Sequence, residues 1–235
     1  MNRQSNETLD GGLSATPQLS DLKEGMYPLR GESMYASRLV ATVLAVTVLA
    51  TLDVAAYTYG GSPVGISVFV ASVLGFTSWV TTTRRRPRSA PAAFNFYIGT
   101  VVALTALEAE EWYRRMPTAL MHLYPNSFPP EVGISDHVFI AVFPLAGSGF
   151  LLLGALAYFH GTAFGRFAAW FTFAWSIVAG LSVYAFALLA RAPFEYMGGM
   201  ITAPVPVLLA LAGMHRLIKV EGLGDHVRSS QGIAP

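Results

Sequence analysis

The sequence predicts an all-α protein, a polytopic bundle of about six transmembrane helices. The first reason is composition: 53% of the 235 residues are hydrophobic and only 12% are charged, about half the charged fraction of soluble domains. The second is a series of uncharged stretches of about 20 residues, the length that a helix needs to cross a bilayer. The third is an uneven placement of the basic residues, which is typical of multi-pass membrane proteins.

Six apolar stretches are expected to form the spanning helices. They cover residues 39–58, 63–82, 89–107, 138–159, 167–190 and 196–214. Gly60, Gly61 and Pro63 separate the first two helices, because glycine and proline interrupt helical runs. The polar residues 1–36 are expected to form a disordered tail, residues 37–217 the transmembrane bundle, and residues 218–235 a second tail.

The basic residues orient the bundle. With six helices both ends of the chain lie on one side of the membrane, and that side holds most of the 15 lysines and arginines, including the cluster Arg84–Arg88. Cytoplasmic loops of membrane proteins carry an excess of such residues. The sequence therefore predicts a multi-pass protein of the cell membrane with both tails in the cytoplasm.

The sequence also argues against several kinds of functional site. There is no cysteine, which excludes disulfides and thiolate chemistry. The net charge of +1 gives no basis for nucleic-acid binding. Carboxylate di-iron bundles use Glu-x-x-His on inward-facing helices, whereas residues 108–111 read Glu-x-x-Glu. No metal and no cofactor is therefore predicted.

Four ionisable residues are the candidate catalytic groups, because ionisable side chains inside a membrane are costly and mark functional sites. They are Asp53, Glu108, Glu111 and His137, all expected on the side of the bundle away from the tails. Glu108 and Glu111 share one helix face, since residues three apart are neighbours there. Two carboxylates in a low dielectric cannot both ionise cheaply, so one is expected to stay protonated, as general acid chemistry requires.

A structural interpretation stands beside the catalytic one. Glu110 and Glu111 can mark the water interface next to Arg114 and Arg115, and Asp53 can reach the interface from its helix. If the groups are functional, at least three of the four candidates should line a single cavity, with Glu110 nearer the headgroups. The proline-containing segment 116–134 is expected to lie at the interface, as a lid over that cavity or as a plain connector.

Several motifs occur in a recognisable order. They are Ala106–Tyr113 (ALEAEEWY), Ile134–Phe139 (ISDHVF), Gly180–Ser182 (GLS) and Gly198–Pro204 (GGMITAP). Over roughly residues 95–217 this order resembles the HXXEE-domain family of bacterial polytopic membrane proteins. The resemblance implies a helical membrane fold, with Glu110 and Glu111 as the paired glutamates of the motif. Leu107 stands at the histidine position of the motif, and Ser182 stands where an asparagine is expected.

The function predicted first is an intramembrane acid–base enzyme, of the isomerase, cyclase or hydrolase type, acting on an apolar small molecule or lipid. Glu108 and Glu111 would supply the acid and the base, assisted by Asp53 or His137. Two alternatives remain open: a non-catalytic accessory subunit of a membrane complex, and a small-molecule carrier. The expected partners are thus the lipid bilayer together with an apolar ligand or other membrane subunits.

Overall fold

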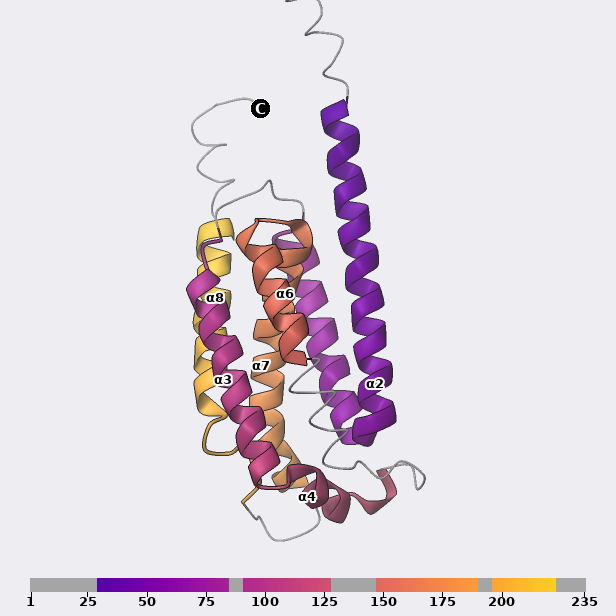
Figure 1. Ribbon diagram of the computed structural model, residues 1–235, viewed down its shortest axis with the longest axis vertical. Coiled ribbons are helices and arrows are strands. Elements are labelled where there is room, and N and C mark those ends of the chain that lie inside the picture. Colours follow the sequence, from indigo (N-terminus) through magenta and orange to yellow (C-terminus); the bar gives the residue numbers. More distant parts are fainter. Residues whose placement is uncertain (1–28, 85–90, 128–146, 190–195, 223–235) are drawn as a thin grey trace, which may run out of the picture. The chain divides into compact units, whose positions relative to one another are not determined.

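The computed structural model describes residues 29–84, 91–127, 147–189 and 196–222 (Figure 1). Its elements are α2 (Leu29–Thr82), α3 (Phe94–Tyr113), α4 (Met116–Leu123), the 3-10 turn η1 (Pro125–Ser127), α6 (Ser148–Phe159), α7 (Ala163–Leu189) and α8 (Pro204–Gly222). These described residues contain no strand, which confirms the all-α prediction for them. The chain divides into the units Met1–Ser37 and Arg38–Pro235, and the packing below concerns the second unit.

The long helix α2 folds back on itself at Gly61. This residue has φ 66° and ψ −178°, a conformation open to glycine because it has no Cβ. Ser72 donates a hydrogen bond of 3.0 Å to Asp53 Oδ1, although a straight helix would separate them by about 28 Å. The two arms therefore run side by side (Figure 1). The predicted break between the first two helices is confirmed at Gly61.

Helix α7 packs against α2, α6 and α8 through a largely aromatic and small-residue surface. Its Phe167, Trp170 and Phe173 are almost fully buried. A Cβ on Gly75 of α2 would come within 2.8 Å of Phe171 Cα, and one on Gly180 of α7 within 2.5 Å of Val207 in α8. Such close backbone approach at small residues is the packing mode of membrane helices.

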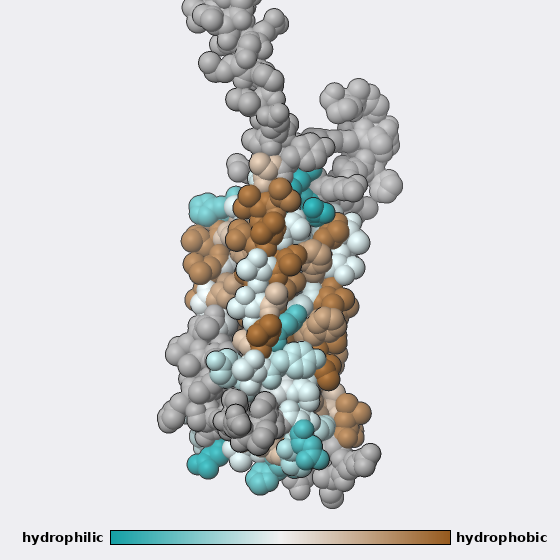
Figure 2. Space-filling model, turned by 90° about the vertical axis from the view of Figure 1, so that its right-hand side faces the viewer, coloured by the Kyte–Doolittle hydropathy of each residue, from teal (hydrophilic) through white to brown (hydrophobic). Residues whose placement is uncertain are grey.

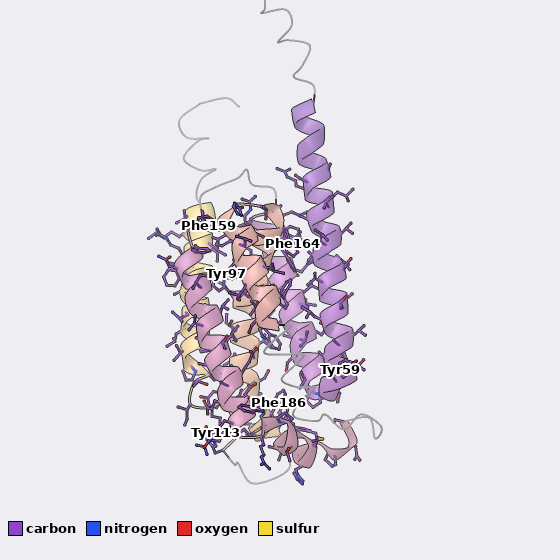
Figure 3. The ribbon with its side chains drawn as sticks, in the orientation of Figure 1. Tyr59, Tyr97, Tyr113, Phe159, Phe164 and Phe186 are labelled. Carbon is purple, nitrogen blue, oxygen red and sulfur yellow. The ribbon has the colours of Figure 1, made fainter. Side chains whose placement is uncertain are left out.

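Tyr97 of α3 ties three helices together in the interior. Its hydroxyl donates to the carbonyl of Leu151 in α6 at 2.7 Å and accepts from Thr172 Oγ1 in α7 at 3.1 Å. Figure 3 shows Tyr97 and Phe159 in one half of the bundle, and Tyr113 and Phe186 in the other, next to α4. The tyrosine thus satisfies buried polar groups in the half remote from α4.

Much of the outer surface is apolar. Large side chains such as Val102 and Leu153 are 65% and 68% exposed, and hydrophobic residues cover much of the face drawn in Figure 2. Soluble monomers rarely expose contiguous apolar areas of this extent. Within the described chain, α2 from Ala36 and α7 are long and apolar enough to cross a membrane, and only 22% of the most apolar part of α2 is buried.

Several helix ends differ from those predicted. Helix α2 begins at Leu29, inside the segment assigned to the first tail, and α8 continues to Gly222. The expected last helix, 196–214, was placed too early, because residues 198–203 form turns before Pro204. Hydropathy marks the apolar part of a helix, whereas caps and backbone hydrogen bonds set its ends. Residues 138–146 of the expected fourth helix lie outside the described residues.

Candidate functional site: a cavity beside two buried glutamates

A small, partly open cavity lies among α2, α3, α4 and α7, at the end of the bundle near α4. Its lining consists of Val64, Ser67, Leu104, Leu107, Glu108, Glu111, Met116, Leu120, Trp175, Ala179, Ser182 and Phe186. Its volume is about 50 Å³, and roughly 10–15 Å³ suffices for one water molecule. The cavity therefore has room for a few waters or for one small chemical group.

Glu108 and Glu111 are the charged-type residues of this lining, and each is only 9% exposed. Glu108 Oε2 is buried and accepts no hydrogen bond from any residue that the structure describes. The described part of the lining contains no lysine, arginine or histidine. A buried polar atom without a partner is unusual, and such atoms often have a catalytic role or bind a water or an ion.

The sequence of α3 explains why these two glutamates face inward. Tyr97, Val101, Leu104, Glu108 and Glu111 follow one another at spacings of four, three, four and three residues, and all of them are buried. Residues at such spacings share one face of a helix. The apolar members of this stripe pack against the bundle, and the stripe carries Glu108 and, one turn later, Glu111 inward with them.

A pair of glycines covers Glu111. Gly199 has φ +96°, and a Cβ there would come within 2.8 Å of Leu107 Cδ1 and 3.0 Å of Glu111 Cγ. A Cβ on Gly198 would come within 3.0 Å of the Glu111 Cα. The chain leading into α8 can therefore press against α3 at Glu111 only because both residues lack a side chain.

Glu110 has a different and fully satisfied environment. Its carboxylate accepts hydrogen bonds from Thr202 N at 2.9 Å and Thr202 Oγ1 at 2.7 Å, from Ile201 N at 3.3 Å, and from the hydroxyl of Tyr196. These donors lie just before Pro204, so Glu110 caps the start of α8 from another helix. Glu110 is thus tied to the chain entering α8 rather than left free toward the headgroups.

The segment after α3 forms one wall of the cavity. Met116 and Leu120 of α4 are buried and belong to the lining. Beyond α4, Tyr124 donates a hydrogen bond of 2.7 Å to the carbonyl of Phe186 in α7, a residue that Figure 3 labels. The described part of the expected interfacial segment therefore packs over the cavity and is fastened to α7.

Asp53 lies apart from the two glutamates. It accepts a hydrogen bond from Ser72 between the arms of α2 and is not among the residues that line the cavity. His137 lies outside the described residues. Among the described candidates, the structure therefore brings together Glu108 and Glu111 and leaves Asp53 elsewhere. No group of three metal-ligating side chains occurs in the ranges that the structure describes.

Two features of the site were missed by sequence reasoning. Ser67 and Ser182 share a hydrogen bond of 2.9 Å across the lining, and Trp175 lines this cavity and a second one of about 60 Å³, which Glu108 also lines. Serine and tryptophan are common in membrane helices, so residue type alone did not mark these side chains as part of a site. The cap at Glu110 did have a sequence signal, because a threonine such as Thr202 shortly before Pro204 is typical of a helix start.

No family model, curated protein or solved structure matches this chain. The resemblance to the HXXEE-domain family, based on Glu110, Glu111 and the segment Gly198–Pro204, therefore stays a prediction. What the chain does must be inferred from the geometry of the cavity and from the chemistry of its two carboxyl groups.

Proposed function

We propose that this chain is a multi-pass membrane protein in which Glu108 and Glu111 transfer protons to and from an apolar small molecule or lipid. The observation that carries the proposal is the buried Oε2 of Glu108, which has no described hydrogen-bond partner in a mainly apolar cavity. A structural carboxylate would be expected to find donors, as Glu110 does. An acid–base group instead needs an oxygen that is free to meet its substrate.

The proposed architecture has about six spans. The arms of α2 supply two, the expected helix 138–159, of which α6 is the described part, supplies a third, and α3, α7 and α8 supply the others. Helix α3 has 20 residues, which is about 30 Å and matches a bilayer core. Its glutamates occupy the last turns, where the cost of a charge falls toward the interface. The proposed orientation, with both tails cytoplasmic, puts Arg84–Arg88 on the inner side and α4 on the outer side.

The chemistry proposed for the pair is a double-bond isomerisation or a related proton shift. One carboxylic acid protonates the carbon at one end of a substrate double bond, and the other group, as carboxylate, removes a proton from the carbon attached to the other end of that double bond. The double bond moves, and the pair ends with the same number of protons as it began. The cavity admits only the reacting part of such a substrate, so the rest of the molecule would lie between helices or in the bilayer.

The test is complementation of a deletion strain followed by untargeted metabolite profiling. E108Q and E111Q remove the acid without a large change of shape, and both are expected to leave the metabolite defect uncorrected. The matched control is Thr105→Val, because Thr105 is exposed on the same helix and bonds only to Val101 O. If both glutamine variants rescue fully, acid–base catalysis is wrong and the accessory-subunit alternative takes its place.

A carrier is the second candidate, favoured by one observation. Glu108 and Trp175 contribute to both cavities, so the carboxyl lies where a ligand could pass from one to the other. A carrier moves its ligand without changing it. Proteoliposomes loaded with the metabolite that accumulates in the deletion strain separate the two functions: conversion inside one bilayer supports the enzyme, and movement of the unchanged compound supports the carrier.

A further inference from the structure

We infer that the ligand of the Glu108–Glu111 cavity is a small organic cation, a protonated amine with a short apolar body. The inference rests on the proposed function and specifies its substrate as an otherwise apolar molecule or lipid that carries one amine group. It starts from the Glu108 side chain, which is 9% exposed, lines the cavity and has one oxygen without a described partner. Three properties of the cavity lead from that carboxyl to an amine.

The first property is charge. Among the residues that the structure describes, the lining holds two carboxyl groups and no basic side chain. Arg114, the next cation along α3, is exposed and lies over the Tyr196 ring, 5.5 Å from its centroid. Burying a carboxylate without a counter-charge is costly, so a bound cation would remove a cost that the described protein leaves in place. An anionic ligand would add to it.

The second property is hydrogen bonding. An ammonium group has three donors and no acceptor, which suits two carboxyl groups one helical turn apart. The carboxyl torsion of glutamate is soft, so Glu108 can turn either oxygen toward a ligand. A hydrocarbon would leave the buried oxygen unsatisfied. The hydroxyls of the described lining, on Ser67 and Ser182, already share a hydrogen bond with each other.

The third property is the rest of the wall. Trp175 and Phe186 supply aromatic surface, and Leu104, Leu107 and Leu120 supply aliphatic surface. Cations bind favourably over aromatic rings, most of all over tryptophan. A volume of about 50 Å³ limits the enclosed part of the ligand to the ammonium and a few carbons. The chemistry fits a free alkylamine and equally the amine end of a longer chain in the bilayer.

The experiment measures binding to the purified full-length protein in phosphatidylcholine nanodiscs by calorimetry at neutral pH and fixed ionic strength. The probes are butylamine, the uncharged 1-butanol, butyrate and sodium chloride. Butylamine is expected to bind at least about tenfold more tightly than butanol, a difference of one decade in Kd. Butyrate is expected not to bind. Equal affinity for butanol, or full competition by sodium chloride, would overturn the inference.

Variants locate the site. E108Q and E111Q are each expected to weaken butylamine binding about tenfold or more, while Thr105→Val leaves it unchanged. If one glutamine variant does not fold, the other still tests whether the glutamates bind the amine. The comparison of butylamine and butanol affinities uses the unaltered protein and needs no variant. Dodecylamine dissolved in the nanodisc lipid tests whether the ligand reaches the cavity from the bilayer. If less dodecylamine than butylamine is needed to occupy the site, the amine comes from the membrane.

Failure of this inference and failure of the proposed function give different results. If butylamine does not bind but E108Q and E111Q leave the deletion strain uncorrected, the amine is wrong and proton transfer stands. If butylamine binds at Glu108 but both glutamine variants rescue the strain, the cavity is an amine site without the proposed catalysis. Amine binding that survives both variants places the amine elsewhere and contradicts the inference.

Discussion

Glu108, Glu110 and Glu111 lie within four residues of α3 in three different surroundings. Glu110 accepts hydrogen bonds from Tyr196, Ile201 and Thr202. Glu111 is covered by the chain at Gly199, and Glu108 has a buried oxygen without a described partner. Glu110 therefore stabilises the fold through its hydrogen bonds, whereas Glu108 and Glu111 are positioned by the fold. Substitutions should separate these two roles.

Glu110→Gln is expected to destabilise the protein by about 1–2 kcal/mol, because the charged cap of α8 is lost. Glu108→Leu is expected to leave stability unchanged or to raise it, because it removes a buried polar atom that has no partner. Thermal unfolding in mild detergent measures both. A larger loss of stability for the Glu108 variant than for the Glu110 variant would show that Glu108 has a structural role.

The hydrogen bond from Tyr196 to Glu110 makes stability depend on alkaline pH. This bond raises the pKa of Tyr196 above its ordinary value of 10.0, because ionisation would destroy the donor beside a carboxylate. The contribution is full below pH 10 and is lost as the pH rises through the raised pKa. The stability difference between the unaltered protein and Tyr196→Phe, under about 1 kcal/mol at this exposed site, should vanish at high pH.

That difference is measured by unfolding curves collected from neutral to strongly alkaline pH. Unaltered protein and Tyr196→Phe should lose the gap between their curves only above pH 10. A gap that persists unchanged at strongly alkaline pH would assign the difference to something other than this hydrogen bond, and a gap that is absent throughout would mean that the bond contributes nothing measurable.

At the scale of the element, the fold depends on where helices stop. The turn at Gly61 pairs the arms of α2 and brings Ser72 to Asp53. The turns before Pro204 bring Gly198 and Gly199 onto α3. Gly61 is needed for its backbone conformation. Gly199 is needed both for its backbone conformation and because a side chain there would clash with α3.

Gly61→Ala should lower stability by about 1 kcal/mol, because alanine at φ 66° is strained. The matched control is Gly99→Ala in α3, where a Cβ would meet nothing closer than Leu209 at 3.6 Å. That change should be neutral or stabilising by up to about 1 kcal/mol, since alanine favours helix. Thermal unfolding of the two variants side by side measures the difference, and equal effects would contradict the role given to the turn.

Local patterns predicted what depends on near neighbours. Glycine and proline marked the break in α2, and the three-residue spacing put Glu108 and Glu111 on one face. The partners of Glu110 could not be predicted, because Tyr196 is 86 residues away and only tertiary packing brings it close. The start of α8 was misplaced because Tyr196–Ala203 is mostly apolar, and hydropathy does not distinguish an apolar turn from a helix.

At the scale of the whole molecule, the apolar exterior and the two membrane-length helices support a membrane protein, and the basic residues give the proposed orientation. Reporter fusions after Arg88 and after Met214 should be cytoplasmic, and a fusion near Pro125 should be external. Enzymatic reporters active on only one side of the membrane make the measurement. A cytoplasmic signal at Pro125 would reverse the proposed side of α4 and of the glutamate cavity.

The central claim, a buried carboxyl pair that handles protons, is tested most directly by carboxyl modification. Dicyclohexylcarbodiimide partitions into apolar regions and reacts with a carboxylic acid by taking up its proton. Treatment of the protein in nanodiscs at neutral pH, followed by peptide mass spectrometry, should find the adduct on Glu108 or Glu111 and not on Glu110. Adducts confined to Glu110 or Asp53, or none on the protein, would contradict the claim.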